Sequence, residues 1–310
     1  MKVAVSGANG FVGRALTTRL ERGGHEVRRL VRVQSAPDEI AVGNLSIAPT
    51  GLDVALRRVS TVVHLAARAH TMNGISVDSC AAFNASNVEG TRRLAVAAVA
   101  AGVERFVFVS TVKVHGETTA IGEPFRASDA LVPKDPYADS KAEAEALLAG
   151  FARDFEVVIV RPPLVYGPGV KANFHMLTES VRRGIPLPVG RIVNARSLVG
   201  IDNLCSLLNV VAVHPAAAGQ AFLVSDGPPV STPQLVAAIA RAMGRKALMV
   251  PVPVLALRLA GAAVGRGALV ERLCSSLAVD IDDTCRILSW QPKLSLEAGL
   301  RSMLAIGRST

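Results

Sequence analysis

Residues 2–13 read Lys2-Val3-Ala4-Val5-Ser6-Gly7-Ala8-Asn9-Gly10-Phe11-Val12-Gly13. A short β-branched run leads into three glycines at Gly-x-x-Gly-x-x-Gly spacing, and a helical pattern follows. Such glycines permit a tight turn, a close approach of backbone to a pyrophosphate, and tight packing of the helix on the sheet. Three glycines are a weak signal in isolation, but the strand before and the helix after are the context that dinucleotide binding requires. We therefore predict that a dinucleotide contacts Gly7, Asn9, Gly10, Phe11, Val12 and Gly13; the alternative is a purely structural glycine turn.

The first 165 residues repeat this alternation of β-branched runs and amphipathic stretches, which is typical of βαβ units in a parallel sheet. The predicted strands are Lys2–Ser6, Glu26–Val31, Thr61–Leu65, Arg105–Ser110 and Val157–Val160. Two helices, Val88–Ala101 and Pro136–Ala149, each end before a glycine. The pattern predicts an α/β fold with a doubly wound parallel Rossmann sheet.

After Pro168 the rhythm breaks, because proline and glycine become dense. We predict a dinucleotide-binding domain over residues 1–168 and a smaller, mostly helical substrate lobe over residues 169–310. One strand near residues 221–225 is expected to return to the main sheet. The sequence contains no internal repeat or flexible linker, so we expect the two parts to pack together.

Composition excludes several other classes of protein. No stretch of about 20 apolar residues lacks a charge, and no signal peptide is evident, so we expect a cytoplasmic protein without a membrane span. The four cysteines are far apart, which predicts no metal site. The formal charge of +9 is dispersed and aromatic residues make up only 4%, which argues against nucleic acid as a partner.

The end of the second predicted strand bears on the choice of cofactor. An NAD site usually has an acidic residue there to hold the ribose 2′-hydroxyl, whereas this chain runs into Arg32. A guanidinium can hold a 2′-phosphate through two hydrogen bonds. The sequence therefore favours NADP(H), with NAD(H) still possible and an exposed, unpaired arginine as the alternative. Asn44 and Leu45 are candidate neighbours of the adenine.

Tyr137 and Lys141 are four residues apart on a predicted helix, so they share one face. An ammonium beside a phenol stabilises the phenolate, and we expect it to lower the tyrosine pKa from its ordinary value near 10. Ser110 and Thr111 follow a predicted strand at the edge of the sheet that faces the cofactor. A hydroxyl there can bond a substrate oxygen whose charge changes during hydride transfer.

These motifs together resemble the extended short-chain dehydrogenase/reductases, the NAD-dependent epimerase/dehydratase family. The resemblance covers nearly the whole chain. Two segments, residues 165–174 and 196–204, more narrowly resemble bacterial nucleotide-sugar 4-reductases and 4-epimerases. The motifs that carry the resemblance are Gly7 to Gly13, His64 to Ala67, Asn87 to Thr91, Ser110 to Gly116, Tyr137 to Lys141 and Arg161 to Gly169.

The resemblance implies roles for individual residues. Thr111 takes the position of the catalytic Ser/Thr, Tyr137 carries the proton, and Lys141 also holds the nicotinamide ribose. Ser110 and His115 are candidate substrate contacts, although a solvated loop is the alternative for the histidine. Asn173 and Arg196 match positions that hold the nucleotide diphosphate. The remaining implied cofactor contacts are Leu65, Ala66, Ala67, Asn87, Pro162 and Leu164.

The hypothesis for function is hydride delivery from NADPH to the C4 carbonyl of a UDP-linked 4-keto-6-deoxy sugar in surface-polysaccharide synthesis. The leading alternative is an NAD-dependent nucleotide-sugar 4-epimerase, which uses the same residues. His115 and Arg32 depart from the tyrosine and the acidic residue common in such epimerases. A third reading is a non-catalytic NADP-binding sensor. The resemblance also implies a possible homodimer through the two predicted helices.

Overall fold

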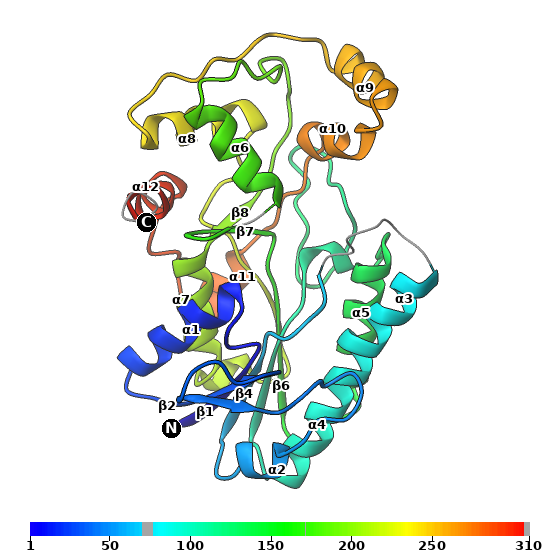
Figure 1. The fold of residues 1–310 in the computed structure, drawn as a ribbon, viewed down its shortest axis with the longest axis vertical. Helices are drawn as coiled ribbons and strands as arrows, with labels where there is room; N and C mark the ends of the chain where they lie inside the picture. The colour runs from blue at the N-terminus through cyan, green and yellow to red at the C-terminus, as the bar shows by residue number, and fades with distance from the viewer. Residues whose placement is uncertain (70–76, 171, 307–310) are drawn as a thin grey trace.

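The computed structural model describes residues 1–69, 77–170 and 172–306, and its centre is a parallel sheet of seven strands (Figure 1). The strands lie in the order β3-β2-β1-β4-β5-β6-β9, and every neighbouring pair is parallel. This arrangement confirms the predicted α/β class with its Rossmann-type sheet. The strands are β1 (Lys2–Ser6), β2 (Glu26–Val31), β3 (Glu39–Ala41), β4 (Thr61–His64), β5 (Arg105–Val109), β6 (Glu156–Arg161) and β9 (Ala221–Leu223).

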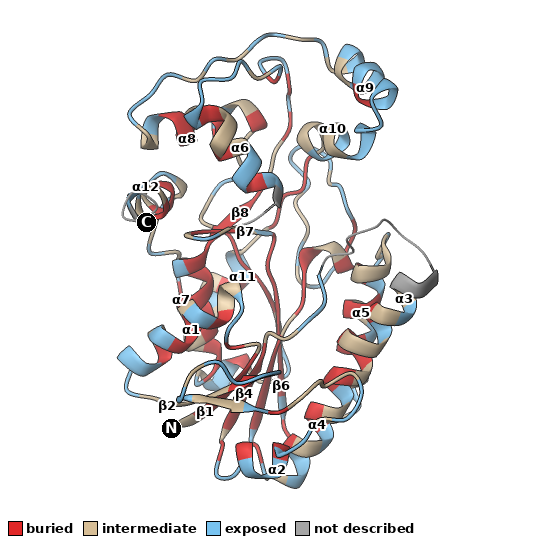
Figure 2. Cartoon of the chain, in the orientation of Figure 1, coloured by how far each residue is buried: buried red, intermediate tan, exposed pale blue. Residues whose placement is uncertain are grey.

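Helices cover both faces of the sheet, and each face has its own apolar core. One core joins the sheet to α1 (Phe11–Arg22), α7 (Ile201–Val211) and α11 (Asp282–Leu288). The other joins it to α2 (Leu52–Ala55), α4 (Gly90–Ala100) and α5 (Pro136–Ala149). Because both faces are covered, the central strands are almost entirely buried, as Figure 2 shows in red.

The helical run before β5 begins earlier than the sequence predicts. It consists of α3 (Val77–Phe83), a π-helical turn η1 (Asn84–Glu89) and α4, whereas the pattern predicts a start at Val88. Asparagine and serine in this stretch have low helix propensity, which hides the helix from a sequence reading. Hydrogen bonds to other elements hold the π-helical turn instead, as described below for Asn87. The predicted helix Pro136–Ala149 is present with those bounds.

The second part of the chain packs at one end of the sheet. It contains a two-stranded parallel sheet and a cluster of helices around a third apolar core. Its elements are β7 (Leu164–Tyr166), α6 (Ala172–Arg182), β8 (Leu198–Gly200), α8 (Thr232–Ala242), α9 (Val254–Ala263), α10 (Gly267–Cys274) and α12 (Leu296–Ile306). None of the helices that the structure describes is long and apolar enough to cross a membrane.

The chain does not divide cleanly between the two parts. After β7 and β8 it returns through α7 and a short 3-10 helix η3 (Pro215–Ala217) to β9, which pairs with β6 at the edge of the main sheet. The sequence expects this return near residues 221–225. The domain boundary at residue 168 stays a prediction, because side chains of α7 and β9 belong to the core of the main sheet.

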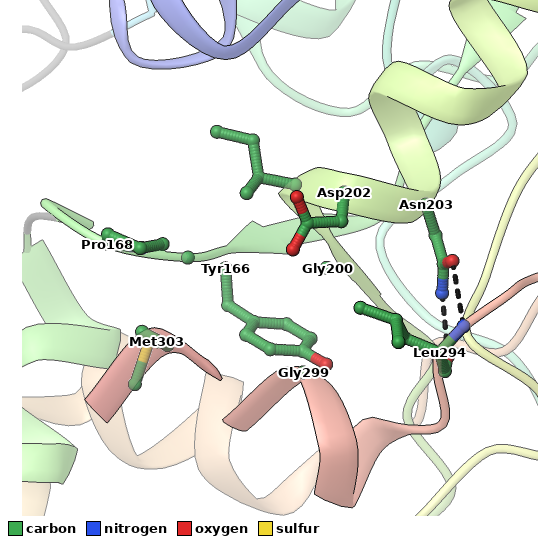
Figure 3. Close-up of a pocket in the computed structure, with 10 residues that line it drawn as sticks. Tyr166, Pro168, Gly200, Asp202, Asn203, Leu294, Gly299 and Met303 are labelled. Carbon is green, nitrogen blue, oxygen red and sulfur yellow. Dashed lines mark hydrogen bonds between the residues drawn. The ribbon is translucent and has the colours of Figure 1, made fainter. Parts of the chain in front are cut away.

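Tyr166 joins β7 to the C-terminal helix. Its hydroxyl donates to Asp226 over 2.6 Å, and the same carboxylate accepts from the Gly200 amide and the Asn203 side chain. The ring lies with its hydroxyl end next to Gly299 of α12 (Figure 3). The cavity at this junction measures about 10 Å³, room for about one water, so it is a packing junction rather than a substrate site.

Candidate active site

The glycine turn after β1 fits against the end of β4. Gly7 has a positive φ of 69°, which disfavours any residue with a side chain. A Cβ atom on Gly7 would lie 2.9 Å from the Ala66 amide nitrogen, and Leu65 donates its amide to Ser6. The predicted cofactor contacts Leu65 to Ala67 therefore lie beside the turn that the glycines form.

The first turn of α1 is open to an anion. Gly10 is the N-cap residue and supplies no side chain to the free amides of Phe11 and Val12. Amides at a helix N-terminus bind phosphate groups well. Phe11 reaches across to Gly167, where an added Cβ would lie 3.5 Å from its ring. Asn9 is exposed at the turn. The turn thus has amide donors of the kind that bind a pyrophosphate, and its contact with a dinucleotide stays a prediction.

Arg32 is exposed directly after β2. Among the described residues, no carboxylate lies within ion-pair distance of it, and the next two carboxylates along the chain are engaged elsewhere. Asp38 pairs with Arg29, and Glu39 accepts hydrogen bonds from Ser35 and the Ala36 amide. The guanidinium is therefore free to meet a ligand.

Leu45, one of the two predicted adenine neighbours, lies close to α4. Asn44 closes a local turn by accepting the Ser46 amide, and Leu45 packs against Gly90 at the start of α4. Arg93 donates to the Leu45 carbonyl. Their contact with adenine stays a prediction.

A chain of buried hydrogen bonds links β1 to η1. The Ser6 hydroxyl lies 2.5 Å from Nδ1 of His64, and Nε2 of that ring lies 2.9 Å from the Thr91 hydroxyl, which donates to the Asn87 carbonyl. Burial, helped by the charge of Lys141, lowers the pKa of His64 to about 3, so the ring is neutral. His64 was recognisable in the sequence only as part of a motif, and this role was not predicted.

Asn87 continues this network to α5. Its side chain donates to the Ser140 hydroxyl over 2.8 Å and pairs with the backbone of Arg68 in both directions. Ser140 donates in turn to the Tyr137 carbonyl. These bonds explain why the π-helical turn forms, and they fix the first turn of α5 relative to the glycine turn.

Tyr137 and Lys141 lie in the first two turns of α5, and α5 contacts the 3-10 helix η2 (Val112–Val114) that follows β5. Burial and the Asp135 carboxylate raise the pKa of Tyr137 to about 12. This is the opposite of the predicted direction and corrects it: Lys141 is not among the groups that shift the phenol here. The Tyr137 ring lies 6.0 Å from that of Phe83.

Lys141 is almost completely buried, with 2% of its surface exposed. Its ammonium lies 4.0 Å from the centre of the Phe108 ring. Burial lowers its pKa to about 7, although the Glu145 carboxylate opposes the shift. The lysine therefore changes its protonation readily near neutral pH.

Thr111 and Ser110 stand at the carboxyl end of β5. Thr111 is the N-cap residue of η2, and its hydroxyl accepts the Lys113 amide over 3.3 Å. The Ser110 hydroxyl is buried and has no hydrogen-bond partner among the described residues. Pro162 lies beside η2 and accepts the Val112 amide, whereas Leu164 on β7 is 45% exposed. The unpaired hydroxyl is a group that a ligand can satisfy.

His115 is neither solvated nor open to a substrate, which corrects both interpretations of the sequence. It is buried, its Nε2 lies 3.0 Å from Arg161, and its Nδ1 lies 3.3 Å from the Ala130 carbonyl. Its ring stacks on Phe125. Arg161 in turn forms a buried, bidentate pair with Glu145 of α5. His115 therefore belongs to the structural core behind the site.

Arg196 reaches the C-terminus of α10. Its Nη1 donates to the carbonyls of Arg272 and Ser275 over 2.7 and 3.0 Å. Burial and the neighbouring charge of Arg272 lower the pKa of the Arg196 guanidinium. Two arginines thus gather on this side of the lobe. Arg272 was not predicted as a site residue because it lies 76 residues after Arg196 in the sequence. Asn173 is exposed in the first turn of α6.

Three features define a dinucleotide-binding enzyme of the short-chain dehydrogenase type. They are the sheet order, the glycine turn against β4, and the Tyr-Lys pair on α5, which contacts the 3-10 helix after β5. Residues 3–224 match the model of the NAD dependent epimerase/dehydratase family. The chain belongs to that family, and it is an NAD(P)-dependent enzyme of it.

Relatives with assigned names cover almost the whole chain. A UDP-glucose 4-epimerase from Vibrio cholerae is 42% identical over 96% of this chain and 93% of its own length. A 2-alkyl-3-oxoalkanoate reductase from Stenotrophomonas maltophilia is 31% identical over 98% of this chain and 99% of its own length. The solved structure of MoeE5 in complex with UDP-glucose and NAD is 26% identical, with a TM-score of 0.77 over 100% of this chain and 99% of that one.

Proposed function

We propose that this enzyme transfers hydride between a nicotinamide cofactor and C4 of a UDP-linked hexose, with 4-epimerisation as the reaction. The observation that carries the proposal is the position of Tyr137 and Lys141 on α5, which packs against the 3-10 helix that begins at Thr111. The 42% identity to a UDP-glucose 4-epimerase over nearly the full length supports the reaction. The UDP-glucose and NAD in MoeE5 support the substrate and cofactor classes.

The three side chains have separate tasks. Tyr137 exchanges a proton with the oxygen on C4, Thr111 bonds the same oxygen and orients it, and Lys141 holds the nicotinamide ribose. With a pKa raised to about 12, Tyr137 is protonated at neutral pH and is ready to act as an acid. The glycine turn after β1 would hold the nicotinamide cofactor, which would supply the hydride exchange.

The diphosphate of the substrate has suitable partners on the lobe. Arg196 and Arg272 lie together, and the repulsion between them is relieved when an anion binds. Asn173 remains a proposed third contact. The involvement in polysaccharide synthesis and the homodimer stay predictions from the resemblance.

Arg32 favours a second candidate, an NADPH-dependent 4-reductase. It has no carboxylate partner among the described residues, and no acidic residue takes the ribose position at the end of β2. A reductase exchanges its cofactor in every turnover, whereas an epimerase regenerates NAD on the enzyme and can retain it. The two reactions use the same proton carrier.

The test begins with the nucleotide that remains bound after purification. Stoichiometric NAD, together with interconversion of UDP-glucose and UDP-galactose without added cofactor, supports the epimerase. Empty enzyme that binds NADPH reversibly and oxidises it in the presence of a UDP-4-keto sugar supports the reductase. If neither sugar nucleotide turns over under either condition, the proposal that C4 of a UDP-hexose is the reaction centre is wrong.

A further inference from the structure

Lys113 connects the two elements that carry Thr111 and Tyr137. It lies in η2, two residues after Thr111, and its ammonium sits between two carboxylates. One belongs to Glu117, 2.9 Å away, and the other, in closer contact, belongs to Asp135. The side chain of Lys113 is 29% exposed and that of Asp135 is 20% exposed, so the pair is partly shielded from water.

Asp135 has a second partner in α5. It is the N-cap residue of that helix, and its Oδ1 accepts the Ala138 amide over 2.7 Å while Oδ2 meets Lys113. Pro136 then occupies the first position of the helix. The carboxylate therefore ties the start of the helix that carries Tyr137 to the 3-10 helix that begins at Thr111.

Among the described residues, few charged groups affect the ionisation of Tyr137. Asp135 is the one carboxylate that raises the pKa of the phenol, in addition to burial. Burial opposes the charge on Lys113, but hydrogen bonds to Asp135 and Glu117 outweigh it and raise the pKa of the lysine. Lys113 and the Ala138 amide likewise overcome burial and lower the pKa of Asp135, so both members of the pair are charged.

The other elements packed against this turn contribute the following groups. Helix α5 also carries Asp139, which is exposed, and Lys141, and β4 contributes the neutral His64. The described part of α3 contributes the uncharged Phe83. Glu117, just after η2, is held by Lys113. Asp135 is thus the negative charge whose pairing matters most for the phenol.

We infer that Lys113 is a positioning residue: through Asp135 it holds the first turn of α5 against η2, and it offsets the carboxylate charge beside the Tyr137 phenol. The inference rests on the proposed function in assigning Tyr137 the proton transfer. Without the lysine, the negative charge of Asp135 is no longer offset, and the phenol loses its proton less readily. Without the carboxylate, the phenol loses its proton more readily.

If the Lys113–Asp135 pair only stabilised the fold, its loss would have a different effect. Loss of such a pair lowers the melting temperature without changing a titration in the active site. Measuring the ionisation of Tyr137 therefore distinguishes a positioning role of Lys113 from a purely structural one, whereas measuring stability does not.

Two variants should shift that ionisation in opposite directions. Lys113→Met removes the cation and keeps the length of the side chain, whereas Asp135→Asn removes the negative charge and keeps a good N-cap residue. Lys113→Arg should restore the wild-type behaviour. Lys134→Met is the matched control, because Lys134 is exposed and adjacent to Asp135 in sequence.

The direct measurement is a titration of tyrosine labelled with ¹³C at Cζ, in enzyme saturated with oxidised cofactor. The chain has only two tyrosines, so the Tyr166→Phe variant assigns the Tyr137 signal. We expect the pH midpoint to rise in Lys113→Met and to fall in Asp135→Asn, each by about one unit. The pH limb of kcat should move with it, and KM should change less than kcat.

The inference is overturned if both variants leave the midpoint where it is, or if both move it in the same direction. Melting temperatures of the variants verify that each is folded at the temperature of the titration. The titration needs no turnover, so it separates this inference from the proposed function. Full activity of Tyr137→Phe would refute the proposed proton carrier. The titration of the Lys113 and Asp135 variants, which keep Tyr137, would still test the coupling between Lys113, Asp135 and the phenol.

Discussion

A methyl group on Gly13 would stand 2.2 Å from the carbonyl oxygen of Gly7, well inside the contact distance of the two atoms. The contact involves backbone on both sides, so no flexible side chain can move away. We expect Gly13→Ala to push α1 from the glycine turn and to weaken cofactor binding by tenfold or more, which nicotinamide fluorescence can measure. Gly267→Ala is the control, because an added Cβ there has open space and should leave binding unchanged. Equal affinity in both variants would contradict the close packing of α1.

The two tyrosines of the chain should respond differently to loss of their hydroxyl groups. Tyr137→Phe removes the proposed proton carrier and should lower kcat by 100-fold or more, with little effect on cofactor binding. Tyr166→Phe removes the bond to Asp226 and should lower the melting temperature while turnover is retained at 25 °C. If Tyr137→Phe kept its rate, Tyr137 would not be the proton carrier.

The affinities of the Arg32→Ala variant for NADPH and NADH test which of the two cofactors the enzyme prefers. If the guanidinium binds a 2′-phosphate, the dissociation constant of NADPH should rise by about tenfold or more and that of NADH should stay the same. Arg57→Ala, another exposed arginine near β2 in sequence, serves as the control. Equal changes for both cofactors would remove the basis for a reductase.

Arg272 is exposed beside Arg196, so its substitution should affect ligand binding more than folding. We expect Arg272→Met to weaken UDP binding by about tenfold, as measured by calorimetry, with a melting temperature close to that of the wild type. Arg191→Met, at another exposed arginine of the lobe, should do neither. Unchanged UDP affinity in Arg272→Met would place the diphosphate elsewhere.

His64 gives the folded protein a specific sensitivity to acid. Its pKa falls from an ordinary 6.5 to about 3 on folding, so the ring is neutral in both states above pH 6.5. As the pH falls from 6.5 towards 3, the unfolded chain binds a proton that the folded chain excludes. The free energy of unfolding should therefore fall by up to about 1.4 kcal/mol per pH unit from this group.

Chemical denaturation at several pH values tests this dependence. The slope should be shallower in His64→Gln, although that variant is also less stable at neutral pH because it disturbs the bonds to Ser6 and Thr91. His175→Gln, at an exposed histidine on α6, should keep the wild-type slope. Identical slopes in all three proteins would show that His64 is not the group responsible.

The main sheet and the helix at Pro136 could be predicted from the sequence because each has a local signal: β-branched runs for the strands, and Pro136 and Gly150 for the start and end of the helix. The short strands β3, β7 and β8 were missed, since three residues are too few to show a period. The π-helical turn was missed because its stability comes from Asn87 meeting Ser140 and Arg68, groups far away in sequence.

The candidate site also contains residues that could be recognised from the sequence and residues whose surroundings depend on distant segments. The glycines, Tyr137 and Lys141 are recognisable by spacing and Thr111 by the family resemblance. They lie at the start of α1, on α5 and at the start of η2. His115 was misjudged because its burial depends on Arg161 and Phe125, which arrive from other segments. The predicted direction of the Tyr137 pKa shift was wrong because burial and, after it, the Asp135 carboxylate raise this pKa.

The late position of β9 in the chain matters during synthesis. Until it is made, β6 is an outer strand with an unpaired, apolar edge, and the core on the α7 side of the sheet is incomplete. About 60 residues separate the two strands, which corresponds to several seconds on the ribosome at about 5–20 residues per second. During that interval the nascent chain presents an aggregation-prone edge, so its yield in cells should depend on chaperones and on growth temperature more than the stability of the finished protein suggests.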